Sequence, residues 1–377
     1  MNHQTTGSVH KSIFFLGRFS GILFIFLQLI GCSGGSGNGT HGQGNDLPRP
    51  KIVSVSGSPG GRSANIAGSN FGTKATATPL KWDNFEAGTV GNRIGGNNAV
   101  IGGTWSDFSS GSTYPVYNAT QVRPNSTRSS YYDYASAYNI SLQEIHDNQA
   151  EWFFSYWYYT NQADSARQSK PWQMYGSSSD EPMTYMGWGQ NGVDGFLRIG
   201  MMDAGSSDPN NGAAANQSWY GVGASDIASV RNKWIRIDVY LKQSTGGLTN
   251  GEYRVWLSNG TNSTWMSLWR YPTKTRSTSN YWRQLMLGEY FGGGNTTHQV
   301  WMDDVYIDST QARVEICDKS TWTSRTHCEI QIPTTWLDNS ITFNVNPGSF
   351  TDLRNTYLYV VDSNGNVDSN GYSLAGL

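Results

Sequence analysis

A segment of alternating side chains, residues 234–242, carries the residue types best suited to bind a ligand. Every second position, from Ile235 to Leu241, is apolar. The positions between them are aromatic or charged: Trp234, Arg236, Asp238, Tyr240 and Lys242. Because successive side chains of a strand point to opposite faces, this pattern predicts a strand with one face in a core. Aromatic rings stack on sugar rings, and guanidinium and carboxylate groups bind hydroxyls or carboxylates, so the other face is typical of a sugar-binding sheet.

Two further segments offer similar side chains. Along residues 252–257 apolar residues again alternate, which leaves Arg254 and Trp256 on the opposite face. Arg198 stands between two apolar neighbours and is predicted to lie opposite a core in the same way. The full set of predicted ligand-binding residues is Trp234, Arg236, Asp238, Tyr240, Arg254, Trp256 and Arg198. The structural alternative is that these side chains cover a sheet face packed against loops, or face water.

Composition limits the class of partner. Only 14% of the residues are charged, and the formal net charge is −2. Phosphate backbones are bound by clustered Lys and Arg, so nucleic acid is not expected as a partner. The 15 Trp and 21 Tyr suit both a large β-sandwich core and exposed platforms for sugar rings. Residues 151–159 are aromatic on both faces, which predicts a central strand buried on both sides.

A carboxylate falls on the predicted core face of the last strand of the central region. Period-two alternation puts Trp301, Asp303, Val305 and Ile307 on one face. A buried, unpaired charge is costly, so an inward Asp303 requires a compensating partner. Asp304 points the other way in this pattern and is expected to be solvated.

No segment combines the residues that a familiar catalytic mechanism requires. A glycosidase needs two carboxylates flanking the bond that it cleaves, whereas Glu289, Asp238 and Glu252 are isolated. The motifs of sandwich alginate lyases, nucleotide sites and zinc sites are absent. The histidines beyond the N-terminal region match no motif: His146, His298 and His327. We therefore expect a non-enzymatic protein without an organic cofactor; if it is an enzyme, a polysaccharide lyase is favoured over a glycoside hydrolase.

The first 31 residues have the pattern of an export signal. An apolar run over residues 19–30 is shorter than the roughly 20 residues of a membrane-spanning helix. It ends in Leu29-Ile30-Gly31-Cys32, which resembles the lipobox of bacterial lipoproteins. The resemblance implies a lipoprotein signal peptide over residues 1–31, a lipid on Cys32, and a place at the cell surface or outer membrane. The alternative is a plain signal peptide with an incidental cysteine.

Two cysteines remain after Cys32, namely Cys317 and Cys328. An even pair in an exported chain predicts a disulfide, which would stabilise the folded state by roughly 3 kcal/mol through loop closure. A metal site is not expected there, because the neighbouring His327 alone cannot complete a ligand set.

The body of the chain is predicted to be all-β, because strand-like runs alternate with Gly, Asn and Ser turns. Its two ends resemble complementary halves of an IPT/TIG domain, which is a small immunoglobulin-like sandwich. Residues 50–72 end in the G-x-x-F-G turn Gly68-Ser69-Asn70-Phe71-Gly72, and residues 312–373 contain a W-x-D-x-x-I edge and a final hairpin. The resemblance implies one interrupted domain, with halves at 48–78 and 311–377. Three domains in series are the alternative.

Residues 79–310, between those halves, open with LKWDNFEAGTVG and close with VWMDDVYID. These ends resemble jelly-roll carbohydrate-binding modules and concanavalin A-like lectin or glucanase domains. The predicted architecture is thus a jelly-roll β-sandwich inserted in, or flanked by, the smaller immunoglobulin-like sandwich. The resemblance also implies a structural calcium ion held by Asp303 and Glu86 with backbone carbonyls, since Ca²⁺ prefers oxygen ligands. A hydrogen-bonded Asp303 without metal is the alternative.

Residues 32–47 are rich in Gly, Ser and Asn, which predicts a flexible tether. We therefore expect an exported lipoprotein that touches the membrane through its lipid alone and binds a polysaccharide on a jelly-roll sheet face. Two alternatives stay open: a polysaccharide lyase that acts in the same groove, and a structural or adhesion protein with a protein partner.

Overall fold

The computed structural model describes residues 48–375, except for 58–61, 136, 138, 163–168, 179–180, 189–196, 203–216, 224–229, 261–265, 277–280 and 292–297. The predicted signal peptide, Cys32 and the tether lie outside the described residues. The described residues form strands and a short 3₁₀ turn, Trp322–Ser324. None of their helical segments has the length and apolar character to cross a membrane. The predicted all-β fold class is confirmed.

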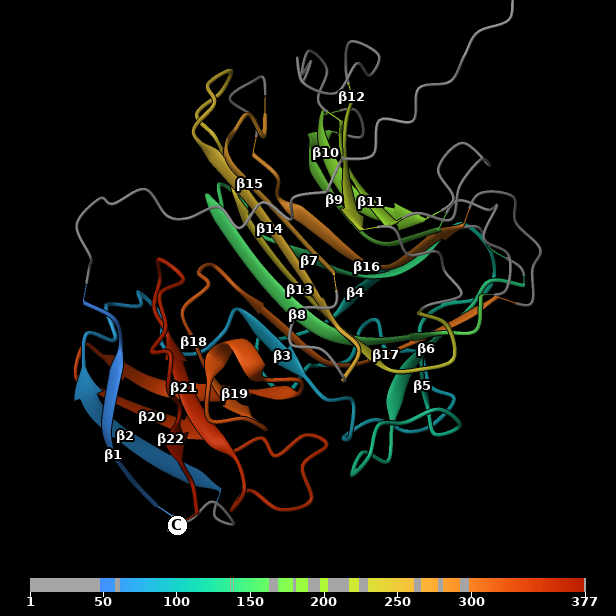
Figure 1. Cartoon of the computed structure of the whole chain (residues 1–377). Coiled ribbons are helices and arrows are strands. Elements are labelled where there is room, and N and C mark those ends of the chain that lie inside the picture. Colours follow the sequence, from blue (N-terminus) through green and yellow to red (C-terminus); the bar gives the residue numbers. More distant parts are fainter. Residues whose placement is uncertain are drawn as a thin grey trace, which may run out of the picture. The chain divides into compact units, whose positions relative to one another are not determined.

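Strands from both ends of the described chain build one sheet. Its order is β1 (Lys51–Ser56), β2 (Ser63–Ser69), β20 (Ser340–Asn344), β19 (Cys328–Leu337), β18 (Arg313–Cys317), β21 (Tyr357–Val361) and β22 (Tyr372–Ser373). In Figure 1 the blue strands β1 and β2 lie beside the orange strand β20. β19 pairs with β18 through its first residues and with β20 through its later ones. The sheet therefore encloses a core of its own, to which both chain ends contribute, for example Ile66 and Ile341.

The G-x-x-F-G segment shows why the chain turns as it does after β2. Phe71 is fully buried in the core of this smaller sandwich. Asn70 has a left-handed φ of 60°, which suits Asn better than most residues. A Cβ atom added to Gly68 would lie 2.1 Å from the carbonyl oxygen of Lys51, so this position requires glycine.

The remaining strands form two sheets that enclose a second core. The seven-stranded sheet has the order β12 (Gln217–Gly223), β11 (Leu197–Met202), β10 (Glu181–Trp188), β9 (Ser169–Ser178), β16 (Gln284–Phe291), β7 (Asn139–Ile145) and β4 (Ser106–Ser109). The eight-stranded sheet has the order β15 (Met266–Thr273), β14 (Gly251–Ser258), β13 (Ile235–Lys242), β8 (Glu151–Thr160), β17 (Gln299–Asp308), β6 (Ser129–Asp133) and β5 (Val116–Asn118), with β3 (Lys81–Asp83) paired to β17. This is the predicted jelly-roll sandwich.

Local alternation sorts the side chains of β13 and β14 as predicted. The apolar residues of β13, from Ile235 to Leu241, are fully buried in the jelly-roll core. Tyr253, Val255 and Leu257 of β14 join them there. The residues that alternate with these apolar ones along both strands therefore lie on the outer face of the eight-stranded sheet. β8 is buried on both sides, as its aromatic faces predict.

The predicted alternation along β17 is wrong, because a bulge interrupts it. The pairing of β17 with β8 shifts between Asp303 and Tyr306, and Asp304 has a left-handed φ of 47°. Val305 and Ile307 do face the jelly-roll core, but before the bulge the core residues are Val300 and Met302. The extra residue of a bulge moves every earlier side chain to the opposite face. Trp301 and Asp303 thus lie on the outer face.

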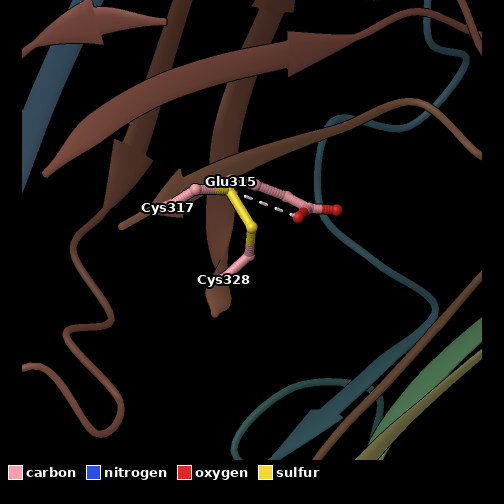
Figure 2. Close-up of side chains that lie close together, drawn as sticks. All are labelled: Glu315, Cys317 and Cys328. Atoms are coloured by element: carbon pink, nitrogen blue, oxygen red, sulfur yellow. Dashed lines mark hydrogen bonds between the residues drawn. A yellow bond between two sulfur atoms is a disulfide. The ribbon is translucent and has the colours of Figure 1, made fainter. Parts of the chain in front are cut away.

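The predicted disulfide between Cys317 and Cys328 is present and links neighbouring positions of β18 and β19. Glu315 lies beside it, with its Oε2 atom 3.9 Å from Sγ of Cys317 (Figure 2). Among the described residues this is the only close group of three or more potential metal ligands. Because the two sulfurs are bonded to each other, they link β18 to β19 covalently and do not act as metal ligands.

Candidate functional site

The predicted ligand face of the jelly-roll sandwich is partly covered by the smaller sandwich. Tyr240, Phe153 and Tyr306 of the eight-stranded sheet pack against Ile330 and Ile332 of β19. Tyr240 is only 2% exposed in this apolar contact. We call this region the covered half of the outer face. Burial of such rings stabilises the contact between the two sandwiches.

Arg236, from the predicted ligand set, is held by both sandwiches and is 5% exposed. Its Nε donates to Oδ1 of Asp238 at 2.9 Å. Its Nη1 donates to the carbonyl oxygen of Cys328 at 3.0 Å, and its Nη2 to Oε1 of Glu315 at 3.2 Å. Burial by itself would lower the pKa of Arg236, but Asp238 and Glu315 outweigh burial and raise it. The side chain is therefore a charged link between β13 and β18.

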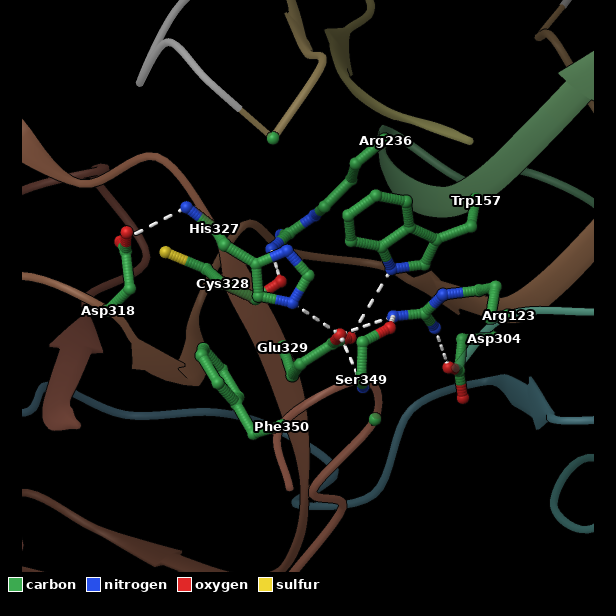
Figure 3. A network of polar contacts seen from close by, with 12 residues as sticks. Arg123, Trp157, Arg236, Asp304, Asp318, His327, Cys328, Glu329, Ser349 and Phe350 are labelled. Carbon is green, nitrogen blue, oxygen red and sulfur yellow. Dashed lines mark hydrogen bonds and ion pairs between the residues drawn. The ribbon is translucent and has the colours of Figure 1, made fainter. Parts of the chain in front are cut away.

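A second buried cation, Arg123, crosses the same contact (Figure 3). It pairs with Asp304 of β17 and with Glu329 of β19. Its Nη2 also donates to Oγ of Ser349 at 2.8 Å, and its guanidinium lies 4.2 Å from the ring centroid of Trp157. Asp304, which the sequence predicts to be solvated, is instead in a partly buried ion pair, because the bulge turns it toward Arg123. That prediction is wrong.

Glu329 accepts hydrogen bonds from side chains of both sandwiches and is 1% exposed. Nε1 of Trp157 lies 3.3 Å from its Oε2, and Nε2 of His327 lies 2.8 Å from its Oε1. Burial would raise the pKa of Glu329, but Arg123 first and then His327 overcome it and lower the value to about 2. Burial instead raises the pKa of Asp304 to about 6, although Arg123 opposes it. Glu329 is thus the firmly ionised partner of this network.

Sequence reasoning missed Arg123, Glu315 and Glu329. Each glutamate stands between two apolar residues of its strand, so period-two alternation places it opposite a core, as it does for Arg236. The alternation of their strands therefore indicates the direction of Glu315 and Glu329 from the sequence alone. Arg123 lies outside the strands, where no periodicity indicates the direction of a side chain.

The rest of the outer face, along β13, β14 and β15, remains accessible, and we call it the open half. Asp238, Arg254 and Trp256 are partly exposed there. Trp269 and Tyr271 of β15, which the sequence did not single out, are 38% and 61% exposed. The residues of the open half are Asp238, Arg254, Trp256, Trp269 and Tyr271.

Glu252 holds two side chains of the open half in place. It pairs with Nε of Arg254, and its Oε1 accepts a hydrogen bond from Nε1 of Trp269 at 2.9 Å. The guanidinium of Arg254 lies 5.2 Å from the ring centroid of Trp269. A fixed indole beside a fixed cation loses little conformational freedom when a ligand binds.

A small, partly open cavity lies beside the open half, where it meets β18 and β19. Its walls come from both sandwiches and include Trp157, Asp238, Trp256, Ser258, Arg325 and His327. The cavity therefore joins three predicted ligand residues, Arg236, Asp238 and Trp256, to residues of the loop between β18 and β19.

Two predicted ligand residues lie elsewhere. Trp234 is partly exposed, donates through Nε1 to the carbonyl oxygen of Val122 at 3.2 Å, and lies 5.6 Å from the ring of Tyr159. Arg198 belongs to β11 of the seven-stranded sheet, where it pairs with Gly187. The structure does not bring Arg198 together with the other predicted residues, and its side chain is outside the described part.

The two predicted calcium ligands have different surroundings. Glu86 is partly exposed, and its Oε1 accepts hydrogen bonds from the backbone of Thr127 at 2.8 Å and of Arg128 at 3.2 Å. Asp303 is fully buried; its Oδ1 accepts from the backbone of Asp304, whereas its Oδ2 accepts no hydrogen bond from the residues that the structure describes. Burial and the charge of Asp304 raise the pKa of Asp303 well above its usual range. An unpartnered buried oxygen is compatible with a bound cation.

We predict that Glu329→Gln lowers the free energy of unfolding at neutral pH by about 3 kcal/mol or more, because it leaves Arg123 buried without its main partner. Since the pKa of Glu329 is about 2 in the folded state and 4.5 without the fold, its stabilisation is complete above about pH 4.5 and is lost as the pH falls toward 2. The variant should lack this acid-dependent loss. Urea unfolding from pH 7 to pH 3 measures both effects.

Asp352→Asn is the matched control, because Asp352 forms an exposed ion pair with Arg354. Exposed pairs contribute little, so this variant should unfold like the unchanged protein. Equal stability of the two variants would contradict the importance of Glu329.

No protein-family model and no curated protein matches the chain. Solved structures do show similarity. The PL-14 alginate lyase from Aplysia kurodai is 14% identical, with 61% of this chain and 99% of that chain covered and a TM-score of 0.46. Alginate lyase vAL-1 from Chlorella virus is 13% identical, with 54% and 92% covered and a TM-score of 0.38. The botulinum neurotoxin serotype C1 binding domain is 10% identical, with 66% and 55% covered and a TM-score of 0.38.

Proposed function

We propose that the protein binds a polysaccharide on the open half of its outer sheet face. The observation that carries this proposal is the exposed pair Trp269 and Tyr271, with the fixed cation Arg254 beside Trp269. Trp256 is partly exposed next to them and packs on its other side against the covered half. Large exposed aromatic side chains that gather on one surface mark binding sites more often than scattered apolar residues do. Indole and phenol rings offer flat apolar faces, and Arg254 and Asp238 offer donors and acceptors for hydroxyl groups.

The lyase alternative requires a side chain that accepts a proton, and Lys170 is a candidate that lies outside the open half. Burial lowers the pKa of Lys170, on β9 of the other sheet, to about 8. A lysine with such a pKa is partly neutral near pH 7 and can accept a proton, as a lyase requires of its base. If the protein is a lyase, its polysaccharide would be cleaved rather than only retained.

We also propose that the protein is anchored in a membrane through a lipid on Cys32, which rests on the Leu29-Ile30-Gly31-Cys32 segment. Cells that express the protein should incorporate radiolabelled palmitate into it, and Cys32→Ala should abolish the label. Labelling that persists in the variant would show that the segment is not a lipobox.

A bound calcium ion at Asp303 and Glu86 is a further part of the proposal, supported by the buried Oδ2 of Asp303, which has no hydrogen-bond partner in the described part of the chain. Ligands that bind only the folded state raise its stability. Chelation by EDTA should therefore lower the melting temperature by about 5 °C, the shift expected for a loss of roughly 2 kcal/mol. Asp303→Asn should remove the response to EDTA. A melting temperature that does not change with EDTA would exclude the ion.

Affinity electrophoresis tests the proposed function. The purified protein is run through native gels that contain neutral or uronate-bearing polysaccharides, and we expect at least one polymer to retard it. Trp256→Ala and Trp269→Ala should each weaken the retention about tenfold, because truncated aromatic anchors typically cost more than 1 kcal/mol. The control is Phe108→Ala, which removes a ring that is 42% exposed on β4 of the other sheet.

The gels also separate the alternatives. A cleared zone in the stained polymer would show that the protein is an enzyme and would favour the lyase. Free migration through every gel would contradict sugar binding and favour a structural or adhesion role with a protein partner. Equal retention of all three variants would place the sugar site elsewhere on the molecule.

A further inference from the structure

The cavity beside the open half contains a guanidinium that forms no ion pair with a carboxylate of the described residues. Arg325 follows the turn Trp322–Ser324 and lines this cavity. Its Nη1 donates to the carbonyl oxygen of Trp322, and its guanidinium lies 3.4 Å from the centroid of the Trp322 ring. No carboxylate of the described residues forms an ion pair with Arg325, and its Nε and Nη2 donate no hydrogen bond within that part of the chain.

The surrounding charges leave one cation uncompensated. Arg236 and Arg313 both pair with Glu315, and Arg236 also pairs with Asp238. Those two cations and two anions balance, so Arg325 adds a net positive charge. Burial lowers the pKa of Arg325 to about 10; the charge of Glu315 opposes this and Asp238 opposes it less, whereas repulsion from Arg313 and Arg236 adds to it. A partly buried positive charge of this kind favours the approach of an anion.

The loop that carries Arg325 is held in place at several points. The disulfide between Cys317 and Cys328 closes it. Inside the loop, Oδ1 of Asp318 accepts hydrogen bonds from the backbone of Thr326 at 2.8 Å and of His327 at 3.1 Å. The two residues after Arg325 are thereby positioned, and before it the backbone N–H of Trp322 donates to the carbonyl oxygen of Ser369 at 2.9 Å. Such preorganisation is typical of a binding site, because little ordering remains when the ligand binds.

Trp256 and Arg325 line the same cavity, one from each sandwich. A flat indole beside a guanidinium whose Nε and Nη2 donate no hydrogen bond to the described residues suits a ring that carries a planar anion. A carboxylate matches the guanidinium fork, which can donate two parallel hydrogen bonds to it. A hydroxyl cannot use both donors or the charge in this way.

We propose that the cavity binds the carboxylate of a uronate residue through Arg325 while the sugar ring stacks on Trp256, so that the polysaccharide ligand is an acidic one. This inference rests on the proposed function and adds to it the substrate class and the residue that selects it. Trp256 supplies affinity for the sugar ring, whereas Arg325 distinguishes an acidic sugar from a neutral one.

The test compares a polyuronate with the same polymer after chemical reduction of its carboxyl groups to alcohols. Affinity electrophoresis at low salt should show that the unchanged protein binds the polyuronate at least tenfold more tightly than the reduced polymer. Arg325→Gln should remove this preference and leave the binding of the reduced polymer unchanged. Arg325→Lys should keep part of the preference, because it keeps the charge but loses the fork.

Arg62→Gln is the matched control, since it changes the net charge equally at an exposed arginine outside the cavity. It should retain the preference for the polyuronate. All variants should keep the melting temperature of the unchanged protein, which shows that the loop remains folded. A loss of preference in both Gln variants would indicate only a general effect of charge and would overturn the assignment to Arg325.

The remaining outcomes separate the two claims. Equal binding of the polyuronate and its reduced form, with both sensitive to Trp256→Ala, would overturn the inference and leave the proposed sugar binding in place. Preference for a sulfated neutral polymer over the polyuronate would overturn the carboxylate in favour of a sulfate ester. Failure to bind any polymer would overturn the proposed function itself.

Discussion

Two buried cations, Arg236 and Arg123, join the jelly-roll sandwich to the smaller one. Each is anchored on the larger sandwich, and each forms an ion pair with a glutamate of the smaller one, Arg236 with Glu315 and Arg123 with Glu329. Charges removed from water require partners of opposite sign. If either sandwich packed against an apolar surface instead, its arginines or glutamates would be buried without a partner, at a large cost in free energy. The contact that satisfies them also determines which part of the sheet face remains accessible.

The division of the outer face follows from that contact. Over the covered half, apolar rings such as Tyr240 pack against β19, and the arginines pair within the contact. Over the open half, Trp269 and Tyr271 stay exposed. The cavity lies between these regions, because the loop before β19 ends where the open half begins. Its residual positive charge on Arg325 arises because the neighbouring carboxylates are already used by the pairs that hold the sandwiches together.

Periodicity explains both the success and the failure of prediction along the strands. In β13 and β14 no irregularity interrupts the pairing with β8 and with each other, so alternation alone sorted core from surface. β17 carries a bulge at Asp303 and Asp304, where its pairing changes from β6 to β3. A bulge depends on what the neighbouring strands require, so the alternating sequence of β17 contains no sign of it.

The sequence by itself determined the all-β class, the core-facing rows of β13 and β14, and the disulfide, because these depend on local spacing and on the cysteine count. It indicated which side of β13 carries Arg236 and Tyr240, but not what would cover that side. Only the tertiary structure decided this, since the covering residues of β18 and β19 follow β13 by a long stretch of chain. Alternation reports the direction of a side chain relative to its own strand, whereas burial depends on which distant surface packs against it.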